Sequence, residues 1–484
     1  MECNNANYIP SLHHFGGYVN ITRGQLYYYH VPQFKNKTII WTNGGPGCSS
    51  LEGMLLENGP YTMENLNGHY NLKPNPNSWS KYANMVYVDQ PMNTGFSIGK
   101  TYATDQTQIG VDMAEFIQQL FKLHPLLKHT DLYLAGESFA GQYIPYIARA
   151  CLISNITIKG MIIGNGWIDP ISQYRAYVDF AIHHNLVDTA SLAVAEQQYK
   201  HCEIQLKETE YIKVDICEDI TKSIFNFSKD THNGKCLNMY DIRLHEDGCG
   251  VNWPHTLPQL YQYLQNKTTV NLLHANPEKP WIECQSHTVG DSLSNDVSKP
   301  SFYLLPDLVK TVELYLYSGD QDFICNHMGT EAFLKRMKWQ GTTGFKRDPT
   351  PLYFENEIMG IVQNERNVVY LKIADASHMV PFDQPVKSLH MIESILDGTF
   401  LQGTSHLMSN NNMGDHVHLH SNTRPSLSGV VALLIVTIGI VLFVGMKMKM
   451  KKEQQYELQP DVEMVEVAKN DKEVLYEYED PDDV

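Results

Sequence analysis

A serine in the segment Gly136-Glu-Ser-Phe-Ala-Gly-Gln-Tyr143 has the surroundings of a catalytic nucleophile. The apolar run at 132–135 predicts a buried strand before it, and the apolar residues from Tyr143 onward have helical spacing. A nucleophile elbow needs small residues at such a strand-to-helix turn, because the turn is tight and the hydroxyl must project above the sheet. Ser138 is therefore the candidate nucleophile, and an ordinary turn serine is the alternative that this short motif alone leaves open.

Acyl transfer by serine also requires a general base and an acid that orients it. Strands are predicted at 312–317 and 368–373, and each is followed by a polar loop. The first loop contains Asp320 and Asp322, either of which fits the acid, and the second contains His378. Ser, then Asp, then His is the chain order of α/β-hydrolases, in which the histidine removes the serine proton and the aspartate holds the imidazole tautomer.

A glycine-rich loop, Thr42-Asn-Gly-Gly-Pro-Gly-Cys-Ser-Ser50, follows a strand predicted at 38–41. Glycine lets such a loop leave backbone N–H groups free to bind an anion. A phosphate loop is excluded, because no Gly-Lys-[Ser/Thr] follows. We expect the oxyanion hole to consist of the N–H groups of Gly45 and of Phe139, which directly follows the nucleophile.

The elements that must position these residues alternate between strands and helices. An amphipathic helix around Ile109–Phe121 ends before Pro125, and short apolar runs predict strands at 26–31, 38–41, 85–88, 132–135 and 158–163. This alternation predicts an α/β fold with a mostly parallel sheet, helices on both faces and the reactive groups at the carboxyl ends of the strands. The helical, polar and cysteine-bearing stretch from 172 to 300 is interpreted as a cap inserted over the sheet.

The 484 residues carry a net charge of −17, which argues against nucleic acid as a partner. Twelve Asp and Glu and only two Lys lie between Glu453 and Val484, so this tail has a net charge of −10 and leaves −7 for the rest. The alternating His416, His418 and His420 have no Cys or carboxylate cluster beside them, and we expect no metal or cofactor.

The C-terminal region predicts a membrane anchor. The uncharged stretch 427–446 is long enough to span a bilayer as a helix, and four lysines follow it by residue 452. The positive-inside rule then places the acidic tail, 447–484, in the cytosol and residues 1–397 in a lumen, joined by a polar stalk at 398–426. Cytosolic sorting machinery is a candidate partner of the tail, but Tyr456-Glu-Leu-Gln459 lacks the bulky apolar fourth residue of the usual tyrosine signal, which favours a solvated, disordered tail.

A lumenal location agrees with the glycosylation sequons, all of which precede the predicted span. They lie at Asn20, Asn36, Asn155, Asn226 and Asn266. The first residues have neither a basic region nor an apolar core, as a signal peptide would. We therefore expect the true start of the protein to lie further upstream.

Six blocks of sequence, in the right order, resemble the serine carboxypeptidases between about Gly16 and Leu396. They are Asn43-Gly-Gly-Pro-Gly-Cys-Ser-Ser50, Asp89-Gln-Pro with Thr94-Gly-Phe-Ser97, Gly136-Glu-Ser-Phe-Ala-Gly-Gln-Tyr143, Gly164-Asn-Gly166, Gly319-Asp-Gln-Asp-Phe-Ile-Cys-Asn326 and His378-Met-Val-Pro-Phe-Asp-Gln-Pro385. The predicted anchor and acidic tail make the chain most similar to the fungal pheromone-processing members. The resemblance implies an α/β-hydrolase fold and a trans-Golgi enzyme that removes C-terminal Lys and Arg from peptides.

The resemblance also implies residue roles. It selects Asp322 as the acid of the triad, and it assigns recognition of the substrate's terminal carboxylate to Asn43, Gly44, Glu57 and Glu137. Two glutamates that face a carboxylate repel it unless at least one is protonated, so we expect their pKa values to be raised. Peptide cleavage should then have an acidic optimum.

Glu52 and Met379 occupy positions that line the leaving-residue pocket of the family. We expect Glu52 to pair with a C-terminal Lys or Arg, the alternative being a solvated loop glutamate.

Among the nine cysteines, the family pattern implies a Cys48–Cys284 bond and a free thiol at Cys325. Of the three pairings open to the four cysteines of the cap, we expect the nested one, Cys202–Cys249 and Cys217–Cys236. Cys3 and Cys151 have no evident partner.

Two other functions remain open at this point. One is an esterase or acyltransferase on the same scaffold, since an acyl-enzyme can pass its acyl group to water or to another acceptor. The other is an inactive, membrane-anchored binding protein. The glutamates assigned to the substrate carboxylate favour a peptidase over the first, and the complete triad argues against the second.

Overall fold

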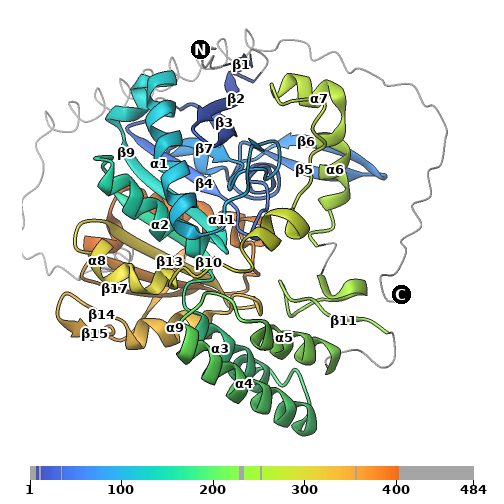
Figure 1. The fold of residues 1–484 in the computed structure, drawn as a ribbon, viewed down its shortest axis with the longest axis vertical. Coiled ribbons are helices and arrows are strands. Elements are labelled where there is room, and N and C mark those ends of the chain that lie inside the picture. Colours follow the sequence, from blue (N-terminus) through green and yellow to red (C-terminus); the bar gives the residue numbers. More distant parts are fainter. Residues whose placement is uncertain are drawn as a thin grey trace, which may run out of the picture. The chain divides into compact units, whose positions relative to one another are not determined.

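The computed structural model describes residues 7–9, 12–33, 35–227, 234–250, 253–354 and 357–402. A twelve-stranded sheet runs through this part of the chain in the order β1-β2-β3-β7-β4-β9-β10-β13-β18-β17-β16, with β8 paired to β3 (Figure 1). Its strands are β1 (Asn7–Ile9), β2 (His14–Ile21), β3 (Gly24–Val31), β4 (Lys37–Thr42), β7 (Asn84–Val88), β8 (Ile98–Gly99), β9 (Asp131–Ser138), β10 (Gly160–Gly166), β13 (Glu313–Gly319), β16 (Thr350–Phe354), β17 (Glu357–Glu365) and β18 (Val368–Ile373).

The centre of the sheet is parallel and its flanks are antiparallel. Neighbours from β7 through β4, β9, β10 and β13 to β18 pair in parallel, whereas β1, β2, β3, β16 and β17 pair antiparallel. Every residue of β7 and β10 is buried, as expected for parallel strands that are covered on both faces. The sequence therefore predicted the parallel centre correctly, and the antiparallel pairing of the flanks is the detail it missed.

Helices cover both faces of the sheet and separate its apolar core into two clusters. One cluster includes residues of α1 (Gln106–Leu123), α2 (Ala140–Ile153), α8 (Leu305–Leu308) and α9 (His327–Arg336). The other includes residues of α6 (Leu257–Gln265), α7 (Lys267–Leu272), α10 (Val380–Asp383), α11 (Pro385–Leu396) and α12 (Thr399–Gln402). Helix α1 begins at an Asp105 cap whose side chain accepts a hydrogen bond from the N–H of Gln108.

The predicted cap contains a helical unit with a third apolar core. It is built from α3 (Pro170–His183), α4 (Thr189–Thr209) and α5 (Asp215–Phe227), which lie together in the lower part of Figure 1. Phe323, from the loop after β13, stacks on Tyr177 of α3 with ring centroids 5.1 Å apart. The loop that carries the candidate acid is therefore packed into the core of the cap.

Shorter elements connect these layers. They are the hairpins β5 (Tyr61–Leu66) with β6 (His69–Pro74), β11 (Cys236–Leu237) with β12 (His245–Glu246) and β14 (Lys338–Trp339) with β15 (Thr342–Thr343), and the helical turns η1 (Gly53–Glu57), η2 (Trp79–Lys81), η3 (Pro125–His129), η4 (Asp247–Gly250), η5 (Ser286–Gly290) and η6 (Ser301–Tyr303).

The nested disulfide pairing expected for the cap is wrong. Cys202 bonds to Cys217 and Cys236 bonds to Cys249. Helices α4 and α5 pack against each other, which brings the Cα atoms of Cys202 and Cys217 to 4.8 Å. The pairing of β11 with β12 returns the chain toward Cys236, so that Cys249 lies 5.0 Å away between Cα atoms. Both bonds therefore join cysteines that are close in the sequence and that local elements bring together, which are the α4–α5 helix pair for one and the β11–β12 hairpin for the other.

The folded domain extends past the predicted start of the stalk at residue 398. Residues Thr399–Gln402 form α12, Phe400 is fully buried in the core, and its carbonyl accepts a hydrogen bond from the side chain of Asn364. No helix among the described residues is long and apolar enough to cross a membrane. The predicted span at 427–446, the acidic tail and Cys3 lie outside the described residues.

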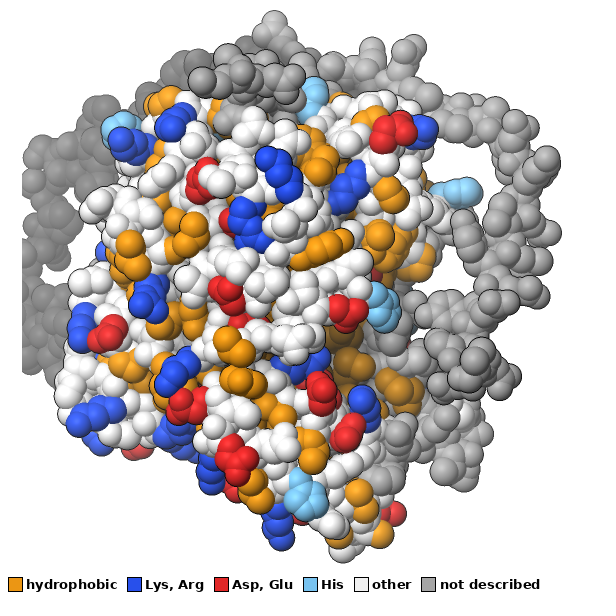
Figure 2. Space-filling model, in the orientation of Figure 1, with side chains coloured by type: hydrophobic (Ala, Val, Ile, Leu, Met, Phe, Trp, Pro, Cys, Tyr) orange, Lys and Arg blue, Asp and Glu red, His pale blue; other side chains and the backbone are white. Residues whose placement is uncertain are grey.

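On the face drawn in Figure 2, acidic and basic side chains are interspersed.

Candidate active site

Ser138 occupies a strained turn between β9 and α2. Its φ of 60° lies in the left-handed region, which non-glycine residues rarely adopt. Small neighbours make this turn possible: a Cβ added at Gly136 would lie 2.1 Å from the carbonyl oxygen of Thr42, and one at Gly141 would lie 2.7 Å from that of Trp167. This is the local geometry of a nucleophile elbow.

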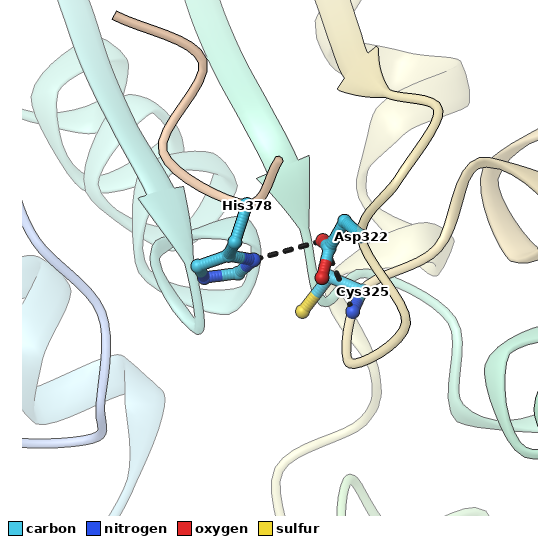
Figure 3. A group of neighbouring side chains, drawn as sticks. All are labelled: Asp322, Cys325 and His378. Atoms are coloured by element: carbon cyan, nitrogen blue, oxygen red, sulfur yellow. Dashed lines mark hydrogen bonds and ion pairs between the residues drawn. The ribbon is translucent and has the colours of Figure 1, made fainter. Parts of the chain in front are cut away.

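His378 and Asp322 form a buried hydrogen-bonded pair (Figure 3). Nδ1 of His378 lies 2.8 Å from Oδ2 of Asp322, and the two residues are 5% and 0% exposed. The other aspartate, Asp320, bonds instead to Gln321 and to the N–H of Ala376. The geometry thus provides an imidazole whose outer nitrogen is free to act as a base while its inner nitrogen is held by a carboxylate.

Asn165 holds the acid and was not assigned a role from the sequence. Its Nδ2 donates to Oδ2 of Asp322 at 2.7 Å, and its Oδ1 accepts from the N–H of Gly319 at 3.2 Å. The N–H groups of Ile324 and Cys325 donate to the same carboxylate at 3.0 and 3.3 Å. The position of Asn165 at the end of β10, between the strands of Ser138 and Asp322, is the signal that could have identified it.

The glycine-rich loop contacts the elbow directly. A Cβ added at Gly44 would lie 2.4 Å from the backbone nitrogen of Phe139 and 2.9 Å from Cβ of Ser138. Gly45 has a φ of +106°, which requires glycine. The two segments expected to supply the oxyanion donors are therefore in contact, with Gly45 lining the cavity of Ser138 and Phe139 lining the adjoining one.

A cavity of about 100 Å³ joins these groups. Its wall combines catalytic, acidic and aromatic residues and consists of Asn43, Gly44, Gly45, Cys48, Glu52, Glu137, Ser138, Tyr240, Trp253, Glu283, Cys284, His378 and Met379. Tyr240 and Trp253 come from the inserted stretch, and Tyr240 lies against the His378 ring with centroids 5.3 Å apart. The insertion therefore forms one wall of the site.

Two buried glutamates lie beside the nucleophile with unused hydrogen-bonding capacity. Nδ2 of Asn43 donates to Oε1 of Glu137 at 3.1 Å, while Oε2 of Glu137 and both carboxyl oxygens of Glu57 accept no such bond among the described residues. The Glu57 and Glu137 carboxyls lie close enough for one to hydrogen-bond to the other when one of them is protonated. Burial raises the pKa of Glu57 to about 7. Burial, helped by the charges of Glu57 and Glu52, raises the pKa of Glu137 well above its usual range. Glu57 lies behind the cavity wall and Glu137 lies in it.

Cys325 is a free, buried thiol next to the His378–Asp322 pair (Figure 3). Burial and the neighbouring Asp322 raise its pKa well above the ordinary value. It is therefore a neutral thiol beside the triad and a poor nucleophile itself. Cys151, the other free cysteine among the described residues, is a buried residue of α2 and does not line this cavity.

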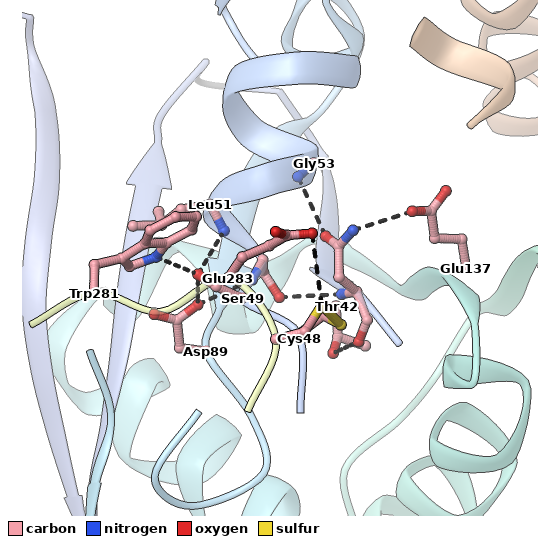
Figure 4. The surroundings of a disulfide bond; sticks show 12 residues. Thr42, Cys48, Ser49, Leu51, Gly53, Asp89, Glu137, Trp281 and Glu283 are labelled. Carbon is pink, nitrogen blue, oxygen red and sulfur yellow. Dashed lines mark hydrogen bonds between the residues drawn. A yellow bond between two sulfur atoms is a disulfide. The ribbon is translucent and has the colours of Figure 1, made fainter. Parts of the chain in front are cut away.

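A segment from the insertion braces the glycine-rich loop (Figure 4). Cys284 is bonded to Cys48, the N–H of Ser49 donates to the carbonyl of Glu283, and the N–H of Gln285 donates to that of Gly47. Nε1 of Trp281 donates to Oγ of Ser49, which in turn donates to Oδ1 of the buried Asp89. The loop is thus fixed by a covalent bond and by hydrogen bonds on both sides of it.

Four of the five sequon asparagines, Asn20, Asn36, Asn155 and Asn266, are exposed. The side chain of the fifth, Asn226, lies outside the described residues.

Comparison with known proteins agrees with this geometry. Residues 5–398 match the serine carboxypeptidase family. The pheromone-processing carboxypeptidase KEX1 of Tuber melanosporum is 39% identical over 425 residues, covering 80% of this chain and 67% of that protein. The KEX1 of Paracoccidioides brasiliensis (strain Pb03) is 40% identical over 424 residues, covering 80% and 66%. The chain thus spans about two thirds of the length of these relatives.

A solved structure is also similar. The crystal structure of Kex1(delta)p, a prohormone-processing carboxypeptidase from Saccharomyces cerevisiae, superposes with a TM-score of 0.74 at 29% identity, covering 80% of this chain and 91% of that one. The elbow serine, the His–Asp pair and the glycine-rich loop lie within the residues that match the family. The chain therefore belongs to the serine carboxypeptidases.

Proposed function

We propose that this protein is a serine carboxypeptidase that removes the C-terminal residue of peptides, preferentially Lys or Arg, through an acyl-enzyme on Ser138. The observation that supports this most is which residues line the cavity beside Ser138. Glu137, which carries an unpartnered and buried carboxyl oxygen, lines the same small cavity as Ser138 and His378. An esterase has no need of buried acids at that point, whereas a peptidase that selects free C-termini does.

In the proposed reaction, His378 accepts the hydroxyl proton of Ser138 as Oγ attacks the carbonyl carbon of the last peptide bond. Asp322 stabilises the imidazolium, and the N–H groups of Gly45 and Phe139 bind the oxyanion. The imidazolium then gives its proton to the departing amino group, and the C-terminal amino acid leaves. A water molecule then gives a proton to His378 and attacks the acyl carbon, and His378 returns that proton to Oγ of Ser138 as the ester bond breaks and the shortened peptide leaves.

The terminal carboxylate of the substrate would bind to Asn43, Gly44, Glu57 and Glu137. A carboxylate accepts hydrogen bonds only from donors, so the glutamates must carry protons to bind it. The raised pKa values of both glutamates support this assignment, because they keep the carboxyls neutral in mildly acidic solution. Peptide binding is then expected to be tightest below pH 7.

The leaving residue would lie against Glu52 and Met379. Both are largely buried in the structure and both line the cavity. The solvated-loop alternative for Glu52 disagrees with its exposure of 8%. A Glu52→Thr variant tests the assignment: it should lose the preference for Lys and Arg, and a variant that keeps that preference would remove Glu52 from the pocket.

We place the reaction in the lumen of a late secretory compartment, with residues 427–446 as the membrane anchor. The three disulfides of the described part support an oxidising compartment, and the four exposed sequon asparagines agree with it. Detergent-solubilised protein whose mass falls after treatment with an N-glycosidase would support this location.

The function is tested by incubating the full chain with N-blocked dipeptides that end in Arg, Lys, Leu or Phe, at pH 5 and pH 7.5. Release of the free amino acid, fastest for Arg and Lys, is the expected result. Matched methyl esters and C-terminal amides identify an esterase if only they are cleaved. Absence of turnover together with absence of labelling of Ser138 by a fluorophosphonate would identify an inactive binding protein.

A further inference from the structure

A second glutamate lies beside Glu52 in the cavity wall. Glu283, next to the disulfide cysteine Cys284, lines the same cavity, and one of its carboxyl oxygens lies within 4.8 Å of a carboxyl oxygen of Glu52. Figure 4 shows Glu283 between Trp281 and the disulfide that braces the glycine-rich loop. The segment that holds this loop thus also carries an acid into the site.

No cation of the described residues neutralises this pair. Neither Glu52 nor Glu283 forms an ion pair within the described part of the chain, whereas the largely buried Asp112 and Asp169 are each paired with an arginine. Glu52 is only 8% exposed. Burying two carboxyls together without a cation is costly unless a ligand supplies the charge.

The position of Glu283 is supported by its neighbours. The hydroxyl of Tyr261, from α6, donates to Oε2 of Glu283 at 3.4 Å. The ring of Tyr261 packs against Trp281 with centroids 5.1 Å apart. The backbone of Glu283 is fixed by the hydrogen bond from Ser49. The other carboxyl oxygen, Oε1, lies 3.7 Å from Sγ of Cys284, a disulfide sulfur that has no proton to donate, so this oxygen can still bind a cation.

We propose that Glu283 and Glu52 together form a two-carboxyl site that binds the side-chain cation of the leaving residue. This rests on the proposed function, because it places the leaving residue in the cavity of Ser138. Glu52 lies directly before η1, and Glu283 lies shortly before η5. The cation would therefore be flanked by two carboxyls from different segments of the chain. Glu283 is then a specificity-determining residue, which the sequence pattern did not single out.

The pair should also make selectivity depend on pH. Burial raises the pKa of Glu283 to about 7, and burial with the charges of Glu283 and Glu57 raises that of Glu52 well above its usual range. A carboxyl is neutral below its pKa and anionic above it, so the pair gains negative charge as pH rises through 7. The other titratable groups that face it are Glu57, Glu137, Tyr240, Tyr261 and His378.

The test compares ligands that differ only in charge. Arginine and citrulline have nearly the same shape, and citrulline is neutral. Binding of both free amino acids to the full chain is measured by calorimetry, and kcat/KM is measured for N-blocked dipeptides that end in each. The variants are Glu52→Gln, Glu283→Gln and the double variant, with the exposed Glu278→Gln of the same segment as the matched control.

We expect the wild type to prefer arginine over citrulline, and Glu283→Gln to reduce that preference about tenfold, the magnitude of one lost charge-assisted contact. The preference should increase from pH 5.5 to pH 7.5 in the wild type and in Glu278→Gln, and increase less in Glu283→Gln. A purely structural role of Glu283 would weaken both ligands equally and leave their ratio unchanged.

The outcomes separate this inference from the proposed function. If no peptide is cleaved, the proposed function fails, and arginine binding still decides the role of Glu283. If Glu283→Gln keeps the arginine-to-citrulline ratio of the wild type, or if the wild type does not distinguish the two, the two-carboxyl site is wrong.

Discussion

At the level of single side chains, the site combines a nucleophile that needs a base with acids that must keep their protons. In the proposed mechanism, Ser138, His378 and the glycine-rich loop serve the acyl transfer, whereas burial raises the pKa of Glu57 and of Glu137 and so favours their neutral forms. These two requirements meet in one cavity because β9 carries Glu137 and Ser138 as consecutive residues. Each can be tested by a substitution that spares the other.

Replacing Ser138 by alanine should lower kcat/KM for peptides by about 10⁴-fold or more, because the nucleophile is removed while the oxyanion hole and the binding groups remain. The variant should keep the melting temperature of the wild type, since Ser138 is a strained residue and not part of the core. Turnover of blocked dipeptides and differential scanning calorimetry measure both. Wild-type turnover in this variant would exclude Ser138 as the nucleophile.

The pH dependence of peptide binding should follow Glu57, whose raised pKa is about 7. Under the proposed assignment, the carboxyl is neutral below this pKa and favours binding of the substrate's terminal carboxylate; above it, it is anionic and repels that carboxylate. The KM for peptides should therefore rise as pH increases through 7. C-terminal amide substrates, which lack the carboxylate, are the control, and an equal rise in their KM would contradict the assignment.

Glu137→Gln should weaken peptide binding about tenfold at pH 5, because a neutral acid donates a stronger hydrogen bond to a carboxylate than an amide does. Matched ester and amide substrates without a terminal carboxylate should be spared. Initial rates at several substrate concentrations give the KM values. Unchanged affinity for peptides at low pH would show that Glu137 does not bind the terminal carboxylate of the substrate.

At the level of elements, the ends of three adjacent parallel strands bring the reactive groups together. Strand β9 ends at Ser138, β10 ends next to Asn165, and β13 leads into the loop of Asp322. Because parallel neighbours end at the same edge, the amide of Asn165 reaches the acid that holds the base. The strand between the nucleophile and the acid thus contributes a positioning residue.

Asn165→Gly tests that role. Glycine tolerates the φ of 41° at this position, so the substitution removes the side chain without straining the backbone. We expect kcat to fall about tenfold or more, with KM little changed, because a charge-assisted hydrogen bond to Asp322 is lost. Asn185→Gly is the matched control, since Asn185 has a φ of 53° and is exposed. An equal fall in KM and kcat, or none at all, would contradict a positioning role.

At the level of the whole molecule, one disulfide connects the glycine-rich loop to the inserted stretch across 236 residues. A cross-link over so long a loop removes much entropy from the unfolded chain, about 5 kcal/mol in the chain-entropy model, against about 3 kcal/mol for a loop of 15 residues. The same bond also fixes the segment that carries Glu283 to the segment that carries Gly45. Stability and catalysis are therefore linked through this bond.

Replacing both Cys48 and Cys284 by serine should lower the melting temperature more than replacing both Cys202 and Cys217, whose sequence separation is 15. The first double variant should also lose peptidase activity at temperatures where it is folded, because the oxyanion loop is released. The second should keep it. Thermal melts and kcat/KM at 15 °C distinguish the two, and equal activity in both would show that the brace is dispensable.

The strands, the elbow turn and the positions of the candidate residues Ser138, Asp322 and His378 after their strands could be predicted because each rests on a local pattern. The apolar run before Ser138 and the polar loops after β13 and β18 are visible in single windows of sequence. Asn165, Glu283 and the pairing of the cap cysteines could not, since their roles depend on contacts between segments. The nested disulfide prediction failed because it ignored the helix pair α4–α5 and the β11–β12 hairpin.

The sequence by itself determined the fold class and the family and indicated a candidate nucleophile, because periodicity and short motifs are properties of neighbouring residues. Only the tertiary structure decided which acids share a cavity and which of them lack a cationic partner. The charges around a buried site come from segments that are distant in the chain, so the net charge of the site is set only when those segments pack together. The site for the leaving residue is therefore a property of the folded molecule, and Glu283 is the residue through which it can be tested.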